Sequence, residues 1–163
     1  MKIGVISDTH IPAAASGLSD EICEHFKTCD CIVHAGDVVE MALIEKLRSI
    51  ADTYAVYGNM DSYAVKRALP EKLVFEAEGL SIGVIHGRGA PARVMRTVRN
   101  DFKDKKLDII IFGHSHAPFN EIIDGTLYFN PGSATDRVFA PYRSFGVIEI
   151  EGKKIKAEII RLP

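Results

Sequence analysis

The sequence predicts an α/β fold in which two β-sheets pack together and helices lie on the outside. In the first two-thirds of the chain, short apolar runs alternate with segments of helical spacing, which is the pattern of alternating strands and helices. After residue 118, two stretches have the pattern of β-hairpins. Of the 163 residues, 47% are hydrophobic and 26% charged, so a single domain spanning residues 1–163 can bury a sizeable core.

The apolar runs of the first part are candidate strands. They lie at residues 2–7, 30–34, 53–57, 72–77, 80–86 and 107–112. We expect most of them to pair in parallel, because helical segments of sufficient length separate them. The tail adds two antiparallel hairpins, with turns at Asp124-Gly125 and Glu151-Gly152.

Four segments between these runs have apolar residues at steps of three or four, so each helix would turn one face to a sheet. Ser19 is the expected N-cap of the first helix, and Pro70 ends the third because proline cannot continue a helix. The helices are expected at about 19–27 with Ile22 and Phe26 inward, after Asp37 with Met41, Ile44 and Leu47 inward, at 62–68, and from Pro91 with Val94, Val98 and Phe102 inward.

Composition and charge exclude several classes of function. The net charge is −2, from 20 basic and 22 acidic residues, so we predict no specific nucleic-acid binding and no attraction to an anionic membrane. The cysteines Cys23, Cys29 and Cys31 form no C-x-x-C pair, which favours free thiols in a reducing compartment. The first apolar run is too short, and broken too soon by Asp8, for a signal peptide or membrane span. These features predict a cytoplasmic protein.

Five of the apolar runs end abruptly in polar side chains. A strand that enters a core has no structural need for a carboxylate and an imidazole where it leaves, yet "GVISDTH" places Asp8 and His10 there. The carboxyl ends of parallel strands line the crevice in which α/β proteins bind ligands, so residues after these runs can converge. The side chains after the five runs are Asp8, His10, Asp37, Asn59, His86, His114 and His116.

This set has the chemistry of a metal site. Imidazole nitrogen with carboxylate and amide oxygen, and no thiolate, suits Mn²⁺, Fe²⁺, Zn²⁺ or Ni²⁺ better than Ca²⁺. Seven candidate ligands exceed the need of one four-coordinate ion and suit two ions that share a carboxylate, an arrangement used for phosphate-ester hydrolysis. Taken singly, Asp37 could cap the next helix and Asn59 could make a turn. Five strand ends together favour the metal site.

The ordered motifs resemble those of the calcineurin-like metallophosphoesterase superfamily. They are D-x-H at 8–10, G-D at 36–37, G-N at 58–59, H-G at 86–87 and G-H-x-H at 113–116. The short length and the segments "GDV", "GNMD" and "NPGS" are most similar to small bacterial and archaeal phosphodiesterases that are grouped with the retromer subunit of the same fold. The resemblance implies a four-layer α/β/β/α sandwich of two mixed sheets.

The same resemblance implies a ligand assignment and a reaction. One metal would take Asp8, His10 and His116, the other Asn59, His86 and His114, and Asp37 would bridge them, which gives Asp37 and Asn59 catalytic roles. The cofactor would be two divalent ions, with Mn²⁺ favoured over Ni²⁺, Fe²⁺ or Zn²⁺. A hydroxide between the ions would attack the phosphorus of a small phosphate ester, with a nucleotide-like substrate as one option.

The alternative is a non-catalytic protein-docking scaffold, because the retromer-type relative keeps this fold with a degraded metal site. All seven ligand positions here have side chains that can bind a metal, which favours the enzyme. Other hydrolase classes lack their groups, since the chain has no H-x-H-x-D-H run, no G-x-S-x-G elbow and no P-loop. The oligomeric state and the natural substrate stay open.

Two positions depart from the family pattern. Met60 stands where many relatives have a histidine that protonates the leaving group. The absence of this histidine favours either substrates with good leaving groups or a proton donor elsewhere in the site, which the sequence does not identify. We expect the adjacent Asp61 to orient the loop. Arg88 stands where short relatives often carry histidine, and its guanidinium could bind a phosphate oxygen or lie in solvent.

The remaining polar residues near these motifs have milder interpretations. His34 is expected to orient a neighbour and His25 to be structural. Asn130 and Ser133 of "NPGS" border the site, and a substrate contact by either is the less favoured interpretation. Arg93, Arg96, Arg99 and Lys103 are expected to form a solvated helix face, with an electrostatic funnel for a polyanion as the alternative.

Overall fold

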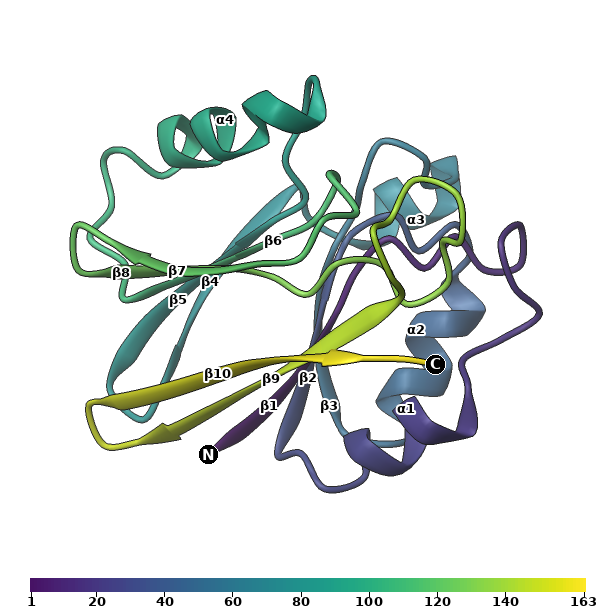
Figure 1. Cartoon of the computed structure of the whole chain (residues 1–163), viewed down its shortest axis with the longest axis horizontal. Coiled ribbons are helices and arrows are strands. Elements are labelled where there is room, and N and C mark those ends of the chain that lie inside the picture. Colours follow the sequence, from purple (N-terminus) through teal and green to yellow (C-terminus); the bar gives the residue numbers. More distant parts are fainter.

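Two five-stranded sheets lie face to face in the computed structural model, which describes residues 1–163, and helices cover the outer faces (Figure 1). The first sheet has the order β10-β9-β1-β2-β3 and the second β4-β5-β6-β8-β7. Each sheet contains parallel and antiparallel neighbours. The predicted four-layer sandwich of two mixed sheets is therefore confirmed.

The elements follow the predicted ranges closely. The strands are β1 Lys2–Ile6, β2 Cys31–Ala35, β3 Asp52–Val56, β4 Lys72–Ala77, β5 Leu80–Ile85, β6 Ile109–Phe112, β7 Phe119–Ile123, β8 Thr126–Asn130, β9 Ser144–Glu151 and β10 Lys154–Arg161. The helices are α1 Asp20–Phe26, α2 Met41–Arg48, α3 Tyr63–Ala68 and α4 Val94–Asp101, the last preceded by a 3₁₀ turn at Pro91–Arg93. None of these helices is long and apolar enough to cross a membrane.

The predicted ends of the helices have physical causes in the structure. Ser19 caps α1, because its side chain accepts a hydrogen bond from the backbone N of Ile22. Ser62 caps α3 in the same way, through the backbone N of Val65. Pro91 lies in the first turn before α4, where its missing N–H has no cost.

The strands of the first part are mostly parallel, as expected, since β1 and β2, β2 and β3, and β5 and β6 all pair in parallel. One antiparallel hairpin interrupts this pattern. β4 runs antiparallel to β5, and the hairpin between them turns at Glu78-Gly79. Both turn residues have positive φ, 51° at Glu78 and 76° at Gly79, as a two-residue hairpin turn requires. Glutamate is an uncommon residue at such a position, so the local sequence carries little signal for this hairpin.

The core lies between the sheets and under the helices. Alternate side chains of the central strands, such as Val5, Val84 and Ile111, are fully buried between the two sheets. Ile22 and Phe26 of α1 pack on the outer face of the first sheet, and Val98 of α4 packs on the second. With their faces covered on both sides, the parallel strands have rigid ends from which the following loops begin.

Candidate metal centre

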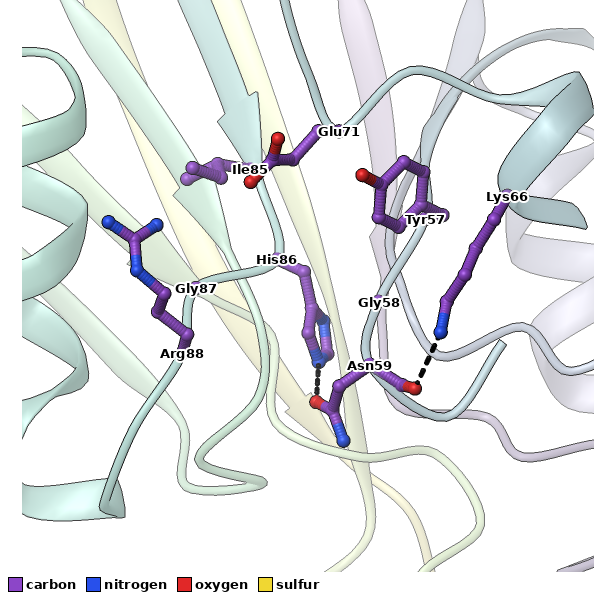
Figure 2. Close-up of a pocket in the computed structure, with 9 residues that line it drawn as sticks. All are labelled: Tyr57, Gly58, Asn59, Lys66, Glu71, Ile85, His86, Gly87 and Arg88. Carbon is purple, nitrogen blue, oxygen red and sulfur yellow. Dashed lines mark hydrogen bonds between the residues drawn. The ribbon is translucent and has the colours of Figure 1, made fainter. Parts of the chain in front are cut away.

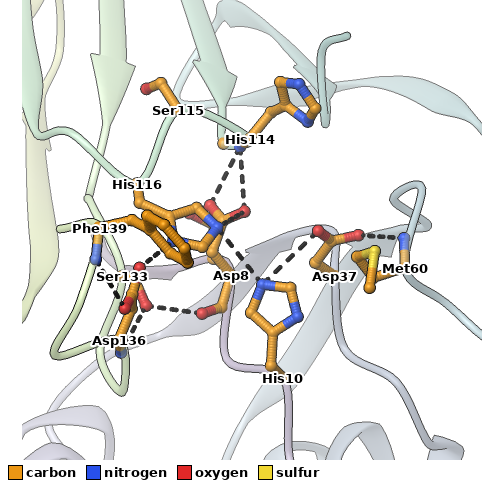
Figure 3. A network of polar contacts seen from close by, with 12 residues as sticks. Asp8, His10, Asp37, Met60, His114, Ser115, His116, Ser133, Asp136 and Phe139 are labelled. Atoms are coloured by element: carbon orange, nitrogen blue, oxygen red, sulfur yellow. Dashed lines mark hydrogen bonds and ion pairs between the residues drawn. The ribbon is translucent and has the colours of Figure 1, made fainter. Parts of the chain in front are cut away.

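The structure brings all of the predicted ligands together where the loops after β1, β2, β3, β5 and β6 meet. They form two groups. The first contains Asp8, His10, Asp37 and His116, whose ligand atoms all lie within 4.8 Å of one another (Figure 3). The second contains Asn59, His86 and His114, and it also reaches Asp37.

In the first group, His116 is the central side chain. Its Nε2 lies 3.3 Å from Asp8 Oδ1 and 3.3 Å from His10 Nε2. His10 Nε2 is in turn 3.6 Å from Asp37 Oδ2. Asp8 is fully buried and Asp37 is 2% exposed, whereas His10 and His116 are partly exposed. The group is therefore buried on its carboxylate side and open on its imidazole side.

In the second group, three acceptor-type atoms converge. Asn59 Oδ1 lies 2.9 Å from His114 Nδ1 and 3.2 Å from His86 Nε2, the latter contact visible in Figure 2. The two ring nitrogens are 3.3 Å apart. His86 Nε2 is also 3.3 Å from Asp37 Oδ2, the same oxygen that faces His10. One oxygen of Asp37 thus lies between the two groups.

The ring tautomers show that these atoms suit a cation. His86 Nδ1 donates to the carbonyl of Ala35 at 2.8 Å, and His114 Nε2 donates to the carbonyl of Gly89 at 2.7 Å. In the neutral rings, the nitrogens that face each other and Asn59 Oδ1 therefore carry lone pairs. Lone pairs at these distances repel unless a proton or a metal ion lies among them. The residues fit a divalent ion at this position.

The electrostatics of the centre favour positive charge. Burial opposes a charge on His86, but the hydrogen bond to Asp37 and the charge of Asp8 outweigh it and raise the pKa of His86 to about 9. The hydrogen bond to Asp8 is the main cause that raises the pKa of His116 to about 9, against its burial. Burial would raise the pKa of Asp37, yet His86 and the backbone of Met60 lower it. Bound cations would satisfy the same carboxylates.

Most of the ligands have an unusual backbone conformation. Non-glycine residues seldom adopt positive φ, and when they do so in clusters they mark functional sites, at a cost of roughly 1–3 kcal/mol each. The sharp left-handed turns let each strand end point its side chain back across the sheet edge. The φ values are 51° at Asp8, 45° at His10, 57° at Asp37, 70° at His114 and 56° at His116.

Glycines beside the ligands make room for ligands from other strands. A Cβ at Gly58 would collide with the carboxylate of Asp37 and lie 2.6 Å from its backbone nitrogen. A Cβ at Gly113 would lie 2.8 Å from Asp8 Oδ2. The glycines of the G-N and G-H motifs are therefore required by close approach, so that the motifs specify packing between strands as well as ligands.

Asp61 orients the loops, as predicted. Its two carboxylate oxygens accept hydrogen bonds from the backbone N of Val39, at 2.5 Å, and of Gly58, at 2.7 Å. These bonds join the loop after Asp37 to the loop that carries Asn59. Asp61 is 5% exposed, and both of its oxygens accept from these backbone groups, so its role is to hold the two loops together.

The sequence analysis missed Asp136, which supports His116. One oxygen of its carboxylate forms an ion pair with His116 Nδ1, and the other accepts from the backbone N of Val138 at 2.7 Å and of Phe139 at 3.1 Å. A carboxylate behind a histidine ligand fixes the ring and raises its basicity. Asp136 lies in an irregular loop after β8, where neither strand periodicity nor a motif identified it.

His34 supports the centre without facing it. Its Nδ1 accepts from the backbone N of Gly36 at 3.2 Å, so its Nε2 donates to Thr9 Oγ1 at 3.0 Å. Complete burial lowers the pKa of His34 to about 3, which keeps the ring neutral, and the orienting role is confirmed. His25 packs against Phe145, with ring centroids 5.1 Å apart, as expected for a structural residue.

The option of a substrate contact by Asn130 or Ser133 was wrong. Both side chains are fully buried. Asn130 donates to the carbonyl of Gly113 at 3.0 Å, and Ser133 donates to the backbone carbonyl of Asp8 at 2.7 Å. "NPGS" therefore holds the loops of the first group from behind.

The cationic residues after His86 form ion pairs or face solvent. Arg88 forms a bidentate pair with Asp101, at 2.7 and 2.9 Å, and lines a cavity together with Asn59 and His86 (Figure 2). Arg99 pairs with Asp124 at 2.7 Å. The cations predicted along α4 are all exposed, as expected for a solvated face: Arg93, Arg96, Arg99 and Lys103.

The described geometry coincides with a family assignment. The calcineurin-like phosphoesterase superfamily domain matches residues 1–153. The chain belongs to this superfamily. Membership implies divalent metal ions and phosphoesterase chemistry, and the group at Asp8, His10, Asp37 and His116 can hold such an ion.

The similar proteins confirm the subgroup predicted from the sequence. A probable metallophosphoesterase of Methanothermobacter thermautotrophicus is 37% identical over 163 residues, covering 99% of this chain and 92% of that protein. A phosphodiesterase of Methanocaldococcus jannaschii is 25% identical, covering 98% and 99%. The structure of vacuolar protein sorting 29 from Cryptosporidium parvum aligns with a TM-score of 0.84 at 24% identity, covering 99% and 91%.

Asp136→Asn should weaken metal binding about 10- to 100-fold. The amide oxygen can still accept from the Val138 and Phe139 backbone, but the amide then presents N–H groups to His116 Nδ1 and no longer fixes the ring. Titration of the metal-stripped protein with Mn²⁺ by calorimetry measures the affinity. Asp124→Asn, which changes an exposed carboxylate on the β7–β8 turn, is the control, and equal affinities in both variants would contradict the role of Asp136.

Proposed function

We propose that the protein is a metal-dependent phosphodiesterase with two divalent ions, bridged by Asp37. The observation that carries the proposal is the position of Asp37 Oδ2, 3.6 Å from His10 Nε2 in one ligand group and 3.3 Å from His86 Nε2 in the other. A carboxylate shared by two nitrogen-rich groups is the arrangement that a dinuclear centre needs. The phosphodiesterase name of the Methanocaldococcus relative supports the choice of substrate class.

The proposed ligand sets follow the two groups. Asp8, His10 and His116 would hold one ion, and Asn59, His86 and His114 the other. Two bound ions would neutralise phosphoryl oxygens and supply a hydroxide nucleophile near neutral pH. Nitrogen and oxygen ligands without thiolate suit Mn²⁺, Ni²⁺, Fe²⁺ and Zn²⁺. We take Mn²⁺, which the family resemblance favours, as the first candidate.

The chain's own residues position the reaction. The Asp8 carboxylate is held by the backbone N of His114, at 3.1 and 3.0 Å, and by Ser7 Oγ at 2.7 Å. Asp37 is held by the backbone N of Met60 at 2.8 Å. These bonds leave little freedom to the carboxylates, so the negative charge that develops on the phosphate oxygens needs no reorganisation of the protein.

The leaving group has no donor at position 60. The Met60 side chain is 60% exposed and carries no transferable proton. General acid catalysis contributes typically about 10²–10⁴-fold, so the proposed enzyme acts best on esters whose leaving groups need no protonation.

The cytoplasmic location and the absence of specific nucleic-acid binding stay predictions.

Metal dependence is the first test. Metal-stripped protein should hydrolyse bis(p-nitrophenyl) phosphate only after a divalent ion is added back, and Mn²⁺ should give the highest rate. Asp37→Asn should lower the rate roughly 100-fold or more, because it removes the shared charge while its amide oxygen can keep the bond to Met60 N. Asp124→Asn should retain wild-type turnover.

Folded protein that shows no turnover with any metal would refute the enzyme and favour the docking scaffold. Circular dichroism of the same samples establishes that each variant is folded. Partner capture would then be the next step for the scaffold.

Met60→His should restore part of the missing acid catalysis. The imidazole would stand beside Asn59 and Asp61, at the exposed rim of the centre, where it can protonate a departing oxygen. The rate should rise more for alkyl than for aryl leaving groups, since aryl oxides leave without a proton. Equal changes in the hydrolysis rates of methyl p-nitrophenyl phosphate and of a dialkyl phosphodiester would disprove the acid role. Met60→Gln is the matched polar control.

Arg88 is proposed as a phosphate ligand in competition with Asp101. If a phosphate oxygen takes the place of the Asp101 carboxylate, Arg88→Ala should raise KM several-fold with little change in kcat. Asp101→Ala should lower KM, because it frees the guanidinium. A KM that is unchanged in both variants would assign Arg88 to a surface ion pair with Asp101.

A further inference from the structure

Two cavities flank the metal centre, one beside each ligand group. The cavity beside Asn59 and His86 has a volume of about 330 Å³ (Figure 2). It is lined by the charged side chains of Lys66, Glu71 and Arg88 and by Tyr57 and Ile85. The cavity beside His10 and His116 has a volume of about 410 Å³. A phosphate bound at the centre would therefore have room for an ester group on either side.

The second cavity, which we call the Phe139 cavity, has apolar walls. Its apolar lining residues are Ala13, Ala14, Val138 and Phe139, and its polar ones are His10, His116, Thr135, Asp136 and Arg137. Val138 is 79% exposed and Phe139 is 82% exposed. Exposed large apolar side chains gathered at a cavity mark a binding surface more often than isolated ones do.

The loop that carries Phe139 is fixed to the metal centre. The Asp136 carboxylate that supports His116 also accepts from the backbone N of Val138, Phe139 and Ala140, the last at 3.2 Å. Figure 3 shows Phe139, Asp136 and His116 in one network. The backbone at Phe139 is thereby held next to a candidate metal ligand, so the position of His116 and that of the loop carrying Phe139 depend on the same carboxylate.

We infer that the Phe139 cavity binds a flat aromatic group esterified to the phosphate. A ring of this kind stacks on Phe139 and displaces water from Val138 and the alanines. The cavity beside Lys66 and Arg88 also contains Tyr57 and Ile85, but charged side chains surround them and fewer of its lining residues are hydrophobic. The aromatic arm of a phosphodiester is therefore directed to the Phe139 cavity. The inference rests on the proposed phosphodiesterase function and assigns its substrate class: diesters with at least one aryl or nucleobase arm.

A fluorescence titration tests the cavity without requiring turnover. The chain contains no tryptophan, so Phe139→Trp introduces a single indole reporter that keeps an aromatic wall. In the Mn²⁺-loaded variant, p-nitrophenylphosphonate should quench the indole emission at concentrations where methylphosphonate does not. Adenosine 5′-monophosphate is the nucleobase probe, and the ring that binds more tightly identifies the source of the aromatic arm.

The matched reporter variant is Tyr54→Trp. Tyr54 is 38% exposed on β3 and stacks on Phe75, with ring centroids 4.1 Å apart, outside both cavities. The emission of this variant should respond equally to the aromatic and the methyl ligand. Quenching of equal strength in both reporter variants, or none in the Phe139→Trp variant, would overturn the inference.

Competitive inhibition gives an independent measurement. With bis(p-nitrophenyl) phosphate as substrate, Phe139→Ala should weaken inhibition by phenylphosphonate about ten-fold and leave inhibition by methylphosphonate unchanged. Phe139→Leu, which is apolar but not flat, should fall between. Equal losses for both inhibitors would show that position 139 acts on the centre itself and would overturn the inference while leaving the phosphodiesterase intact. If wild-type protein has no turnover, the proposed function fails, and quenching in the Phe139→Trp variant alone decides whether the cavity binds aromatic rings.

Discussion

The structure depends on the burial of two carboxylates, Asp8 and Asp37, at a point where parallel strands from both sheets end. Neither side chain reaches solvent to a useful extent, and a buried carboxylate is stable only with hydrogen-bond donors and nearby positive charge. Backbone N–H groups of His114 and Met60 supply the donors. Histidines from the surrounding strand ends and loops supply the remaining polar partners, and in the holoprotein divalent cations would supply the charge. The fold brings these hydrogen-bond donors and histidines to the two carboxylates.

The backbone conformation of the loops that carry the candidate ligands is locally unfavourable in free energy. Left-handed backbone at Asp8, Asp37 and three histidines is unfavourable in itself, and it persists because the layers beneath are well packed. The strands that end at the centre are fully buried between the sheets. Side chains such as Asp61 and Ser133 then fix the loops by hydrogen bonds to backbone atoms. Stability from the core and from these bonds offsets strain that is concentrated in the ligand loops.

The convergence of the seven candidate ligands could be predicted from the sequence because each follows an apolar run, and strand ends converge in α/β folds whatever the length of chain between them. The glycines could be predicted as motif letters, although only the structure shows that Gly58 and Gly113 make room for ligands of other strands. Asp136 could not be predicted, because it lies in a loop without periodicity and its partner, His116, is 20 residues away. The pairing of Arg88 with Asp101 could not be predicted either. Contacts between loops and helix faces depend on tertiary placement, which local sequence patterns do not encode.

The two ligand groups differ in negative charge, so the two sides of the centre are not equivalent. The first group has the carboxylates of Asp8 and Asp37, and its His116 is supported by a third carboxylate, Asp136. The second group shares Asp37 but otherwise has the neutral amide of Asn59, and its histidines donate to the neutral carbonyls of Ala35 and Gly89. A carboxylate partner makes an imidazole a stronger donor to a metal than a carbonyl does. The flanking cavities also differ, since more hydrophobic residues line the cavity beside the more anionic group than line the cavity beside Lys66, Glu71 and Arg88. A phosphodiester bound at the proposed centre would therefore meet different surroundings at its two ester oxygens.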